Sequence, residues 1–501
     1  MGTRLPLAFL SVFGYLATRR LASTFNVDKY LSSVLWSSSY VTWTYFTRTF
    51  SNTVEAVLLS VVLLIVCTSP HVGNSGTALE LKRKNEEDEG QTYKKTAVVN
   101  KSYRFRALIL GILTVAGFFN RPTFLAFAAV PIIFWIYNVT MKHYRGNGVF
   151  NMCSVVFCMS VGAISTFSCF VLADTLYYRP GFLDEMYESI DRLVDRLVSS
   201  GFSSDVIFST FKDSAAGLVV TPWNFVNYNM QTDNLAVHGI HPRYTHFVVN
   251  LPLLTGPLYL PILFITFVSI IGFFNRHKVT KEAHQTVWLT LMMLVPVSVL
   301  SVFPHQEPRF LIPLLPVLMV LGTKVVRVMS PAKYTFCILW GFFNIVLILV
   351  YSFLHQAALV PSMSIYQQKL SSRSGSNREH HAIFYNTYPP PRHLLLIKPE
   401  TTNIKVHDLA GAHRKSLMKL IKETKLSCSR NQGKKCQLYV FLPATVSPII
   451  QDRLSEYKVE ITSICPHLSM EAPPRFHAWW MRKIKFDEFI MDFCLNILRI
   501  S

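Results

Sequence analysis

One short turn in the sequence gathers three side chains that could bind a phosphorylated substrate. The segment VFPHQEPRFLIPLLP brings His305, Glu307 and Arg309 together between two apolar runs. Pro304 and Pro308 interrupt helical hydrogen bonding there, so the three polar groups are expected on a kinked turn at the edge of a membrane. An arginine fork binds phosphate through two parallel hydrogen bonds, and Glu307 could serve as its partner. The plainer alternative is an ion pair between Glu307 and Arg309 that only fixes the turn.

Two further arginines and one acid lie at the predicted ends of apolar segments on the same side. Arg48 in YFTRTFSN and Arg121 in FFNRPTF could join Arg309 around one anionic ligand. The alternative is that each arginine at a helix end only extends toward water. Asp174 in LADTLYYRP is the best-placed acid outside the turn, and its alternative role is helix-end solvation or pairing with Arg179. Together these residues predict a pocket for a phosphorylated, membrane-borne substrate.

The histidines and cysteines form no metal-binding pattern. His238, His241 and His246 in NLAVHGIHPRYTHFVVNLP lack compact ligand spacing, so hydrogen bonding is favoured over metal binding. We place His241 among the substrate-binding residues and expect neither a metal nor a cofactor. The nine cysteines include no CxxC pair. Cys428, Cys436 and Cys465 lie in the C-terminal region, where a disulfide is permitted but its pairing cannot be read.

The rest of the chain must hold these residues in a membrane. Half of the 501 residues are hydrophobic and only 16% are charged, whereas soluble domains carry roughly 25% charged residues. The apolar residues form long blocks that approach the ~20 residues of a spanning helix, which excludes a large soluble protein. We expect an all-α polytopic membrane protein with spans near 5–17, 31–46, 53–69, 105–119, 123–137, 151–173, 251–273, 285–303, 310–326 and 335–355.

The net charge of +20 indicates topology rather than nucleic-acid binding. Lysine and arginine concentrate in alternate short connections, and this pattern marks those connections as cytosolic. It places the N-terminus, the 174–250 loop and the C-terminal region in the lumen, and a flexible mixed-charge loop over 71–104 in the cytosol. We therefore predict a multi-span transmembrane domain over 1–360 and a luminal domain over 361–501.

Two regions differ in pattern from the spans. In residues 181–200, apolar side chains recur on one helical face, which predicts an amphipathic helix. This helix could lie on the membrane surface or pack against the other helices. The C-terminal region alternates strand-like runs (HLLLI, QLYVFLPATV and YKVEITSI) with a helical stretch near 413–424. That alternation predicts a small α/β domain.

HQEPRFLIPLLP closely resembles the HKExRF-type motif of the eukaryotic α-mannosyltransferases that use dolichyl-phosphate mannose. The resemblance runs from about residue 5 to residue 480 through YFTRTFSNTVEAVLL, GFFNRPTFLAFA, DTLYY, LVVTPWNFVNYN and NLAVHGIHPRYTHFVVNLPLLTGPL. These segments look most like the branch that adds the fourth mannose to glycosylphosphatidylinositol (GPI). Gln306, where relatives have lysine, fits that branch.

The resemblance implies a GT-C type scaffold in the endoplasmic reticulum membrane, with a luminal active face. It implies dolichyl-phosphate mannose as the donor and a trimannosyl GPI precursor as the acceptor. The new bond would be an α-1,2 linkage made with inversion, which needs a carboxylate base opposite the leaving phosphate. Arg309, Arg121 and Arg48 are then the candidates that stabilise this phosphate.

The chain departs from that family in one respect. Members begin with a span followed by a luminal His-Pro-Asp-Glu type loop, whose acids are the expected catalytic centre, and this sequence contains no such motif. We therefore expect that the first span and the catalytic loop are missing and that activity could be lost with them. Asp174 and Glu307 are the remaining candidates for the base. Two alternatives stay open: a catalytically inactive subunit that binds the GPI lipid, and a membrane transporter.

Overall fold

The chain forms two compact units, Met1–Asn344 and Ile345–Ser501. The computed structural model describes residues 4–68, 89–143, 148–200, 217–231, 240–274, 280–329, 332–371, 378–395, 404–430 and 435–500. The boundary between the units falls inside a long apolar helix, ahead of the division predicted at residue 360.

Long apolar helices dominate the first unit and continue into the start of the second. Among the described residues, six helices are long and apolar enough to cross a membrane: Ser102–Asn120, Met152–Tyr178, His246–Gly272, Glu282–Ser301, Pro308–Val326 and Lys333–Leu354. Two shorter apolar helices, Ser51–Cys67 and Phe124–Thr140, match two more of the predicted spans. The prediction of a mainly helical, polytopic membrane protein is confirmed.

The helical elements before the second unit follow one another in this order: α1 (Arg4–Leu10), α2 (Val12–Thr24), α3 (Lys29–Ser38), α4 (Tyr40–Tyr45), α5 (Ser51–Cys67), α7 (Glu89–Asn120), α8 (Phe124–His143), α9 (Gly148–Tyr178), α10 (Phe182–Ser200), α12 (Thr221–Met230), η1 (His246–Asn250), α14 (Leu251–Thr255), η2 (Gly256–Leu258), α15 (Tyr259–Phe274), α16 (Lys281–Ser301), η3 (Pro308–Leu314), α17 (Leu315–Val326) and α18 (Lys333–Ile348). Helix α10 confirms the helix predicted over 181–200.

Two of the predicted spans are broken rather than continuous. The segment 31–46 divides at Ser39, where the backbone is extended (ψ 133°) and the hydroxyl accepts a hydrogen bond from the Val41 N–H at 3.3 Å. The Asn344 side chain accepts a hydrogen bond from the Tyr40 N–H at 2.7 Å. These two polar side chains replace the helical hydrogen bonds that the break removes. The segment 5–17 is divided at Ser11, between α1 and α2, although the backbone there stays helical (φ −59°, ψ −21°).

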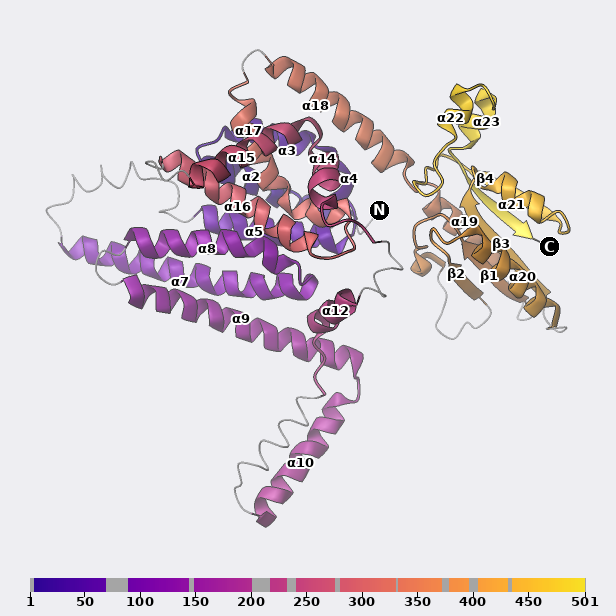
Figure 1. Ribbon diagram of the computed structural model, residues 1–501. Coiled ribbons are helices and arrows are strands. Elements are labelled where there is room, and N and C mark those ends of the chain that lie inside the picture. Colours follow the sequence, from indigo (N-terminus) through magenta and orange to yellow (C-terminus); the bar gives the residue numbers. More distant parts are fainter. Residues whose placement is uncertain are drawn as a thin grey trace. The chain divides into compact units, whose positions relative to one another are not determined.

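Helices α7, α8 and α9 run side by side (Figure 1). Helix α7 begins at Glu89, so the loop predicted over 71–104 is wrong from residue 89 onward, and residues 69–88 lie outside the described chain. The polar stretch continues the helix of the following apolar span, because extending a helix needs no new nucleus. The sequence pattern alone did not reveal this extension.

Glycines allow α7 and α9 to approach each other closely. A Cβ atom on Gly162 would lie 2.3 Å from the carbonyl oxygen of Leu108, and one on Gly111 would lie 2.1 Å from that of Met159. Both distances are shorter than any real carbon–oxygen contact, so larger residues require the two helices to separate. Small residues at membrane helix contacts commonly have this role.

Gly162→Ala is therefore expected to destabilise the protein by about 1–3 kcal/mol, the usual cost of overpacking. The matched control is Gly272→Ala in α15, where a Cβ atom meets nothing within 4 Å. Alanine should be neutral or stabilising at that position by up to ~1 kcal/mol, because it is the better helix former. Thermal unfolding of the two purified variants measures the difference. Equal midpoints for both would contradict the close approach of α7 and α9.

The second unit is built around a mixed five-stranded sheet with the order β2-β1-β3-β5-β4. The strands are β1 (Arg378–Phe384), β2 (Ile404–Asp408), β3 (Lys435–Pro443), β4 (Val459–Ile464) and β5 (Leu495–Ile500). Strands β1, β2 and β3 are parallel, and β5 runs antiparallel to β3 and β4. The helical elements are η4 (Leu349–Leu354), α19 (Leu359–Ser371), η5 (Arg392–Leu395), α20 (Arg414–Arg430), α21 (Ser447–Arg453), α22 (Phe476–Trp480) and α23 (Phe486–Met491).

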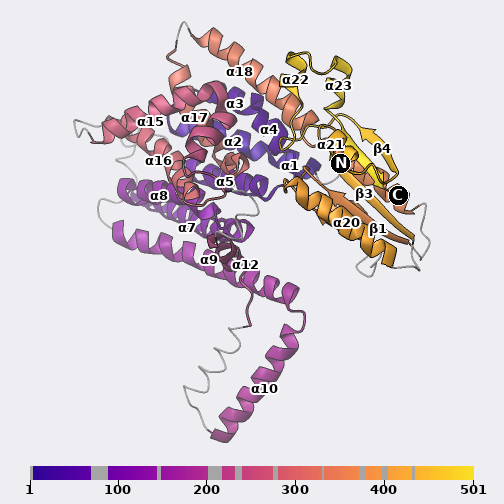
Figure 2. The same cartoon turned by 45° about the vertical axis from the view of Figure 1, so that its right-hand side comes forward.

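Helices cover both faces of this sheet. On one face, Ile421 of α20 packs against Leu438 of β3, and Figure 2 shows α20 lying along the strands. On the other face, the Tyr366 ring of α19 meets the Phe441 ring edge-on, with centroids 5.5 Å apart. The sheet with its helices is the small C-terminal α/β domain that the sequence predicts.

Two details of that prediction change. The first three residues of the run HLLLI are not a strand, because η5 forms a single turn at Arg392–Leu395, directly after three consecutive prolines at 389–391. Disulfides join Cys428 to Cys436 and Cys465 to Cys494. The second pairing brings in Cys494, which was not among the predicted candidates.

Candidate active site

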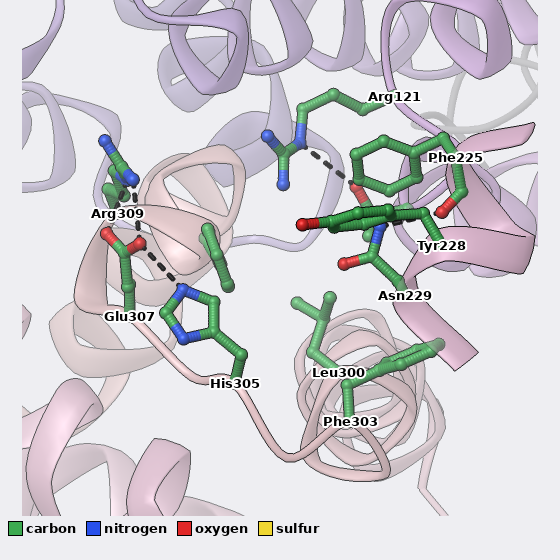
Figure 3. Close-up of a pocket in the computed structure, with 11 residues that line it drawn as sticks. Arg121, Phe225, Tyr228, Asn229, Leu300, Phe303, His305, Glu307 and Arg309 are labelled. Atoms are coloured by element: carbon green, nitrogen blue, oxygen red, sulfur yellow. Dashed lines mark hydrogen bonds and ion pairs between the residues drawn. The ribbon is translucent and has the colours of Figure 1, made fainter. Parts of the chain in front are cut away.

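A cavity of about 390 Å³ in the first unit collects most of the predicted site residues (Figure 3). The α7–α8 turn contributes to one wall, α12 to another, and the end of α16 with the HQEPRF turn completes the lining. The lining side chains are Arg121, Thr123, Phe225, Tyr228, Asn229, Leu300, Phe303, His305, Glu307, Arg309 and Phe310. The cavity is therefore apolar over much of its surface and carries two arginines.

Glu307 organises the HQEPRF turn. Its Oε1 atom lies 2.9 Å from His305 Nε2 and accepts a hydrogen bond of 2.7 Å from Arg309 Nη2. The Oε2 atom lies 2.6 Å from Arg309 Nε, and the guanidinium also lies over the Phe50 ring at 5.6 Å. The ion pair expected as the plainer alternative exists, and it orients an arginine that lines the cavity. Fixing the turn and holding a ligand-binding group are thus compatible roles.

The pKa of Glu307 is held below its ordinary value. Burial by itself would raise that pKa, but the hydrogen bond with His305 and the charge of Arg309 outweigh it. A general base works best when its pKa lies near the working pH. The contacts of Glu307 therefore favour an anion that orients its two neighbours over a base that accepts a proton.

Arg121 approaches the cavity from the α7–α8 turn and is fixed by neighbours on several sides. Its Nη1 donates to Ser51 Oγ at 3.1 Å, and its guanidinium lies over the Phe310 ring at 5.2 Å and the Phe225 ring at 5.9 Å. Burial lowers the pKa of Arg121, the charge of Glu55 opposes this effect, and the charge of Arg309 adds to it. The two guanidiniums thus repel each other across the cavity, an arrangement that an anionic ligand relieves.

Beneath Arg121 lies an acid that sequence reasoning missed. Glu55 of α5 is fully buried, with its Oε2 atom 3.5 Å from Arg121 Nε. Its Oε1 atom accepts a hydrogen bond of 2.6 Å from Thr123 Oγ1. The signal that could have found it is the acid inside the apolar run VEAVLL, because ionisable residues at membrane depth are usually functional.

Gln306 ties the HQEPRF turn to the preceding loop. It is 2% exposed, and its Oε1 atom accepts the backbone N–H of His246 at 2.9 Å. Its amide nitrogen lies 3.2 Å from each of the carbonyl oxygens of Ser301 and Phe303. His241 adds a backbone hydrogen bond of 2.8 Å to the Pro304 carbonyl, and its ring lies 5.9 Å from that of His305. His241 therefore supports the turn without lining the cavity.

Gln306→Leu is expected to destabilise the protein by about 1–3 kcal/mol, because a buried N–H and two carbonyls lose their partner. The matched control is Gln368→Leu on α19, an exposed amide of the second unit. Thermal unfolding of the purified chains measures both effects. A Gln306→Leu variant as stable as the control would show that the loop and the turn are held by other contacts.

Asp174 and Arg48 do not line the cavity. Asp174 accepts a hydrogen bond from Thr221 Oγ1 at the first residue of α12, so it positions the helix that carries Phe225. The pairing of Asp174 with Arg179 is wrong, since Arg179 binds Glu185 at 2.6 Å instead. Arg48 lies in the turn between α4 and α5, where its N–H donates to the Tyr45 carbonyl. His238 falls outside the described residues.

In the described part of the chain, one group of side chains has the composition of a metal site. It comprises His381, Cys428 and Cys436 in the second unit, whose ligand atoms all lie within 4.8 Å of one another. Both sulfur atoms are engaged in the Cys428–Cys436 disulfide, so only the imidazole is left to offer a lone pair. This group belongs to the C-terminal domain and contributes nothing to the cavity lining.

The chain matches the Alg9-like mannosyltransferase family over residues 1–396. It is 31% identical to the human GPI alpha-1,2-mannosyltransferase 4 over 496 residues, which cover 95% of this chain and 74% of that protein. The Aspergillus oryzae GPI mannosyltransferase 4 is 30% identical, with 84% of this chain and 66% of the relative covered. The Saccharomyces cerevisiae relative of the same name is 28% identical, with 76% and 57% covered. No solved structure matches the chain.

These matches confirm the family expected from the HQEPRF motif and its companion segments. The named relatives are transferases, so they favour neither the transporter nor the inactive binding subunit. The helical membrane architecture and the two-arginine cavity agree with a lipid-linked sugar donor. The chain is a multi-pass membrane glycosyltransferase that belongs to the Alg9-like mannosyltransferase family.

Proposed function

We propose that the chain transfers the fourth mannose of a GPI anchor. The donor is dolichyl-phosphate mannose, the acceptor is a GPI precursor that carries three mannoses, and the new bond is an α-1,2 linkage. The acceptor hydroxyl attacks the anomeric carbon from the face opposite the phosphate. The bond from that carbon to the phosphate oxygen breaks and its electron pair stays on the phosphate. The hydroxyl proton passes to water, so the products are the new glycoside and dolichyl phosphate.

The observation that carries this proposal is the pair of arginines in the cavity wall. Arg121 and Arg309 both line the cavity, and each is paired with a carboxylate: Arg121 with Glu55, and Arg309 with Glu307. Charge that develops on a leaving phosphate is stabilised most by donors that are fixed in place before the reaction. Arg48 does not line the cavity, so we assign the phosphate to the other two arginines.

Helix α12 supplies the wall that suits a sugar. Phe225, Tyr228 and Asn229 line the cavity from this helix, as Figure 3 shows. Aromatic rings offer flat apolar area to the C–H face of a pyranose, while hydroxyl and amide groups hydrogen-bond its oxygens. Asp174 acts on this wall through its hydrogen bond to Thr221, so we propose that it orients α12.

Two features support an orientation in which the C-terminal domain lies in the lumen of the endoplasmic reticulum. The second unit contains the disulfides Cys428–Cys436 and Cys465–Cys494. Disulfides persist in oxidising compartments such as the lumen of the endoplasmic reticulum and are rare in the cytosol. The distribution of lysine and arginine among the short loops predicts the same orientation.

A transfer assay tests the proposal directly. Microsomes that lack their own fourth mannosyltransferase receive this chain, labelled dolichyl-phosphate mannose and a trimannosyl GPI acceptor. The expected product is a tetramannosyl GPI whose new residue is released by an α-1,2-mannosidase. The matched control is Arg327→Ala, at an exposed arginine just after α17, which should leave the product unchanged.

Two results would contradict the proposed reaction, and a third would contradict the assigned phosphate site. Transfer to an acceptor with fewer mannoses, but not to the trimannosyl one, would place the enzyme at a different step. A labelled product that resists the α-1,2-mannosidase would exclude the linkage. Full activity in Arg309→Ala at limiting donor would remove that arginine from the phosphate site.

A further inference from the structure

The second unit exposes a cluster of large apolar side chains on α22, α23 and the turn between them. We call this cluster the apolar tip, and its members are Phe476, Trp480, Met481, Phe486, Ile490 and Met491. Each is at least 48% exposed, and Trp480 is 79% exposed. Figures 1 and 2 show α22 and α23 standing beyond the end of the sheet. Exposed apolar clusters of this kind mark sites of interaction.

Aromatic packing on the buried Phe489 supports the apolar tip. Phe489 is 6% exposed, and Trp479 stacks on it with ring centroids 4.8 Å apart. The Phe476 ring meets Phe489 edge-on at 5.1 Å. The two short helices therefore share a small core of their own. Their outer side chains are exposed because this core turns them outward.

An ion pair and a disulfide fix the base of the tip. Arg475 Nη2 lies 2.7 Å from Asp492 Oδ1, and the Arg475 N–H donates to Oδ2 at 3.0 Å. Asp492 is 4% exposed, so this pair is sheltered from water on the carboxylate side. The Cys465–Cys494 disulfide ties the following residues to the end of β4. The exposed apolar surface is thus part of a fixed structure.

Exposed charges surround the apolar side chains. Arg482, Lys483 and Lys485 lie in the turn between the helices, and Asp487 and Glu488 open α23. Aromatic rings next to lysine and arginine are typical of segments that lie at the headgroup level of a membrane. The charges nearly cancel, so apolar insertion rather than attraction to anionic lipid would dominate the contact.

The connection between the second unit and a spanning helix shows which apolar environment the tip can reach. The second unit begins at Ile345, inside the apolar helix Lys333–Leu354 that is long enough to cross a membrane. The unit is therefore tethered directly to a spanning helix, and a bilayer surface is always within its reach. A partner from another chain would have to be supplied separately.

We propose that the apolar tip inserts into the headgroup region of the phospholipid bilayer that the chain itself spans. The second unit is then attached to the membrane at two places, the end of its spanning helix and the tip. The proposal is independent of which sugar the chain transfers.

Photo-crosslinking of the full chain tests this inference. A photoreactive phenylalanine analogue replaces Trp480, and the variant is reconstituted into phosphatidylcholine bilayers that contain a radiolabelled phosphatidylcholine. The matched control carries the same analogue at Leu426 on α20, a position 59% exposed on the same unit. Labelling at position 480 is expected to exceed that at 426 by roughly an order of magnitude, because only the tip lies among lipids.

Each other outcome overturns the inference. Adducts between position 480 and protein, in the same chain or another, would make the tip a protein contact. Equal labelling at both positions, or none at 480, would leave the tip outside the bilayer. Labelling that appears only when phosphatidylserine is added would indicate electrostatic attachment instead of apolar insertion. Transfer activity measured on the same variants separates these results from a failure of the proposed function.

Discussion

Arg121→Gln is expected to abolish detectable mannose transfer and to destabilise the protein by about 3 kcal/mol. The loss of activity follows because Arg121 is one of the two cations that line the cavity. The loss of stability has a different origin. Glu55 is fully buried, and without Arg121 its carboxylate loses the cation that compensates its charge, although the hydrogen bond from Thr123 remains.

The double variant Glu55→Gln/Arg121→Gln separates the two effects. Removing both charges leaves no uncompensated carboxylate, so the double variant should be more stable than Arg121→Gln alone. Its activity should stay absent, because the cation is still missing. Thermal unfolding and the transfer assay give the two measurements on the same preparations. A double variant less stable than either single variant would show that the two residues do not act as a pair.

The single variant Glu55→Gln should have an effect between those of wild type and Arg121→Gln. The amide keeps the shape of the side chain and can still accept the hydrogen bond from Thr123. It no longer holds the guanidinium of Arg121 by charge. We expect Glu55→Gln to lower the apparent affinity for the donor more than the turnover rate, since Arg121 remains present but less fixed. A pure loss of turnover would assign Glu55 a direct part in the chemistry.

Glu307→Gln is expected to lower the turnover rate by roughly 10²-fold, the usual effect of misplacing one transition-state donor. The carboxylate contacts both His305 and Arg309 at the cavity wall, and an amide cannot hold two cationic or donating partners equally well. The transfer assay at saturating donor measures this effect. Arg309→Lys should fail similarly, because lysine lacks the fork that contacts carboxylate and phosphate together. Wild-type turnover in Glu307→Gln would contradict the orienting role.

The pH dependence of stability tests whether Glu307 is an orienting anion or a base with a raised pKa. The pKa of Glu307 is lowered in the folded protein from an ordinary value of 4.5, mainly because His305 and Arg309 overcome the effect of burial. Its stabilising contribution is therefore present above the ordinary pKa and is lost as the pH falls through the lowered one. The difference in unfolding midpoint between wild type and Glu307→Gln should stay constant from pH 7 down to about 5 and shrink at lower pH. A difference that shrinks already near pH 6 would mean that the pKa is raised.

The sequence predicted the parts of the site that are local in the chain. His305, Glu307 and Arg309 form their network within five residues, so the motif alone indicated it. Arg121 was predicted because it follows an apolar span and precedes a proline. Glu55 and the α12 wall depend on helices that are distant in sequence and packed together, and no local period shows such contacts.

In the C-terminal domain, too, the sequence pattern did not predict every element, but the reason is different. Strands β3 and β4 have apolar runs that were read correctly, whereas β1, with the sequence REHHAIF, begins with four polar residues. Glu379, His380 and His381 are nonetheless buried, because the parallel neighbours β2 and β3 flank them on both sides. A strand that is central in a sheet can therefore look like an exposed loop when its polar residues find partners across strands. The break at Ser39 was missed because its caps come from Asn344 and from its own hydroxyl.

Helix α17, which directly follows the HQEPRF turn and η3, is shielded from lipid. Of the apolar span Pro308–Val326, 78% is buried, compared with 17% of Met152–Tyr178 and 11% of Lys333–Leu354. A helix responds to bilayer thickness through the side chains that contact acyl chains, by tilting or by shifting along the membrane normal. Changes in lipid length or sterol content should thus act on α9 and α18, while the depth of Arg309 relative to its neighbours stays constant. The protein would then keep its catalytic geometry in membranes of different thickness.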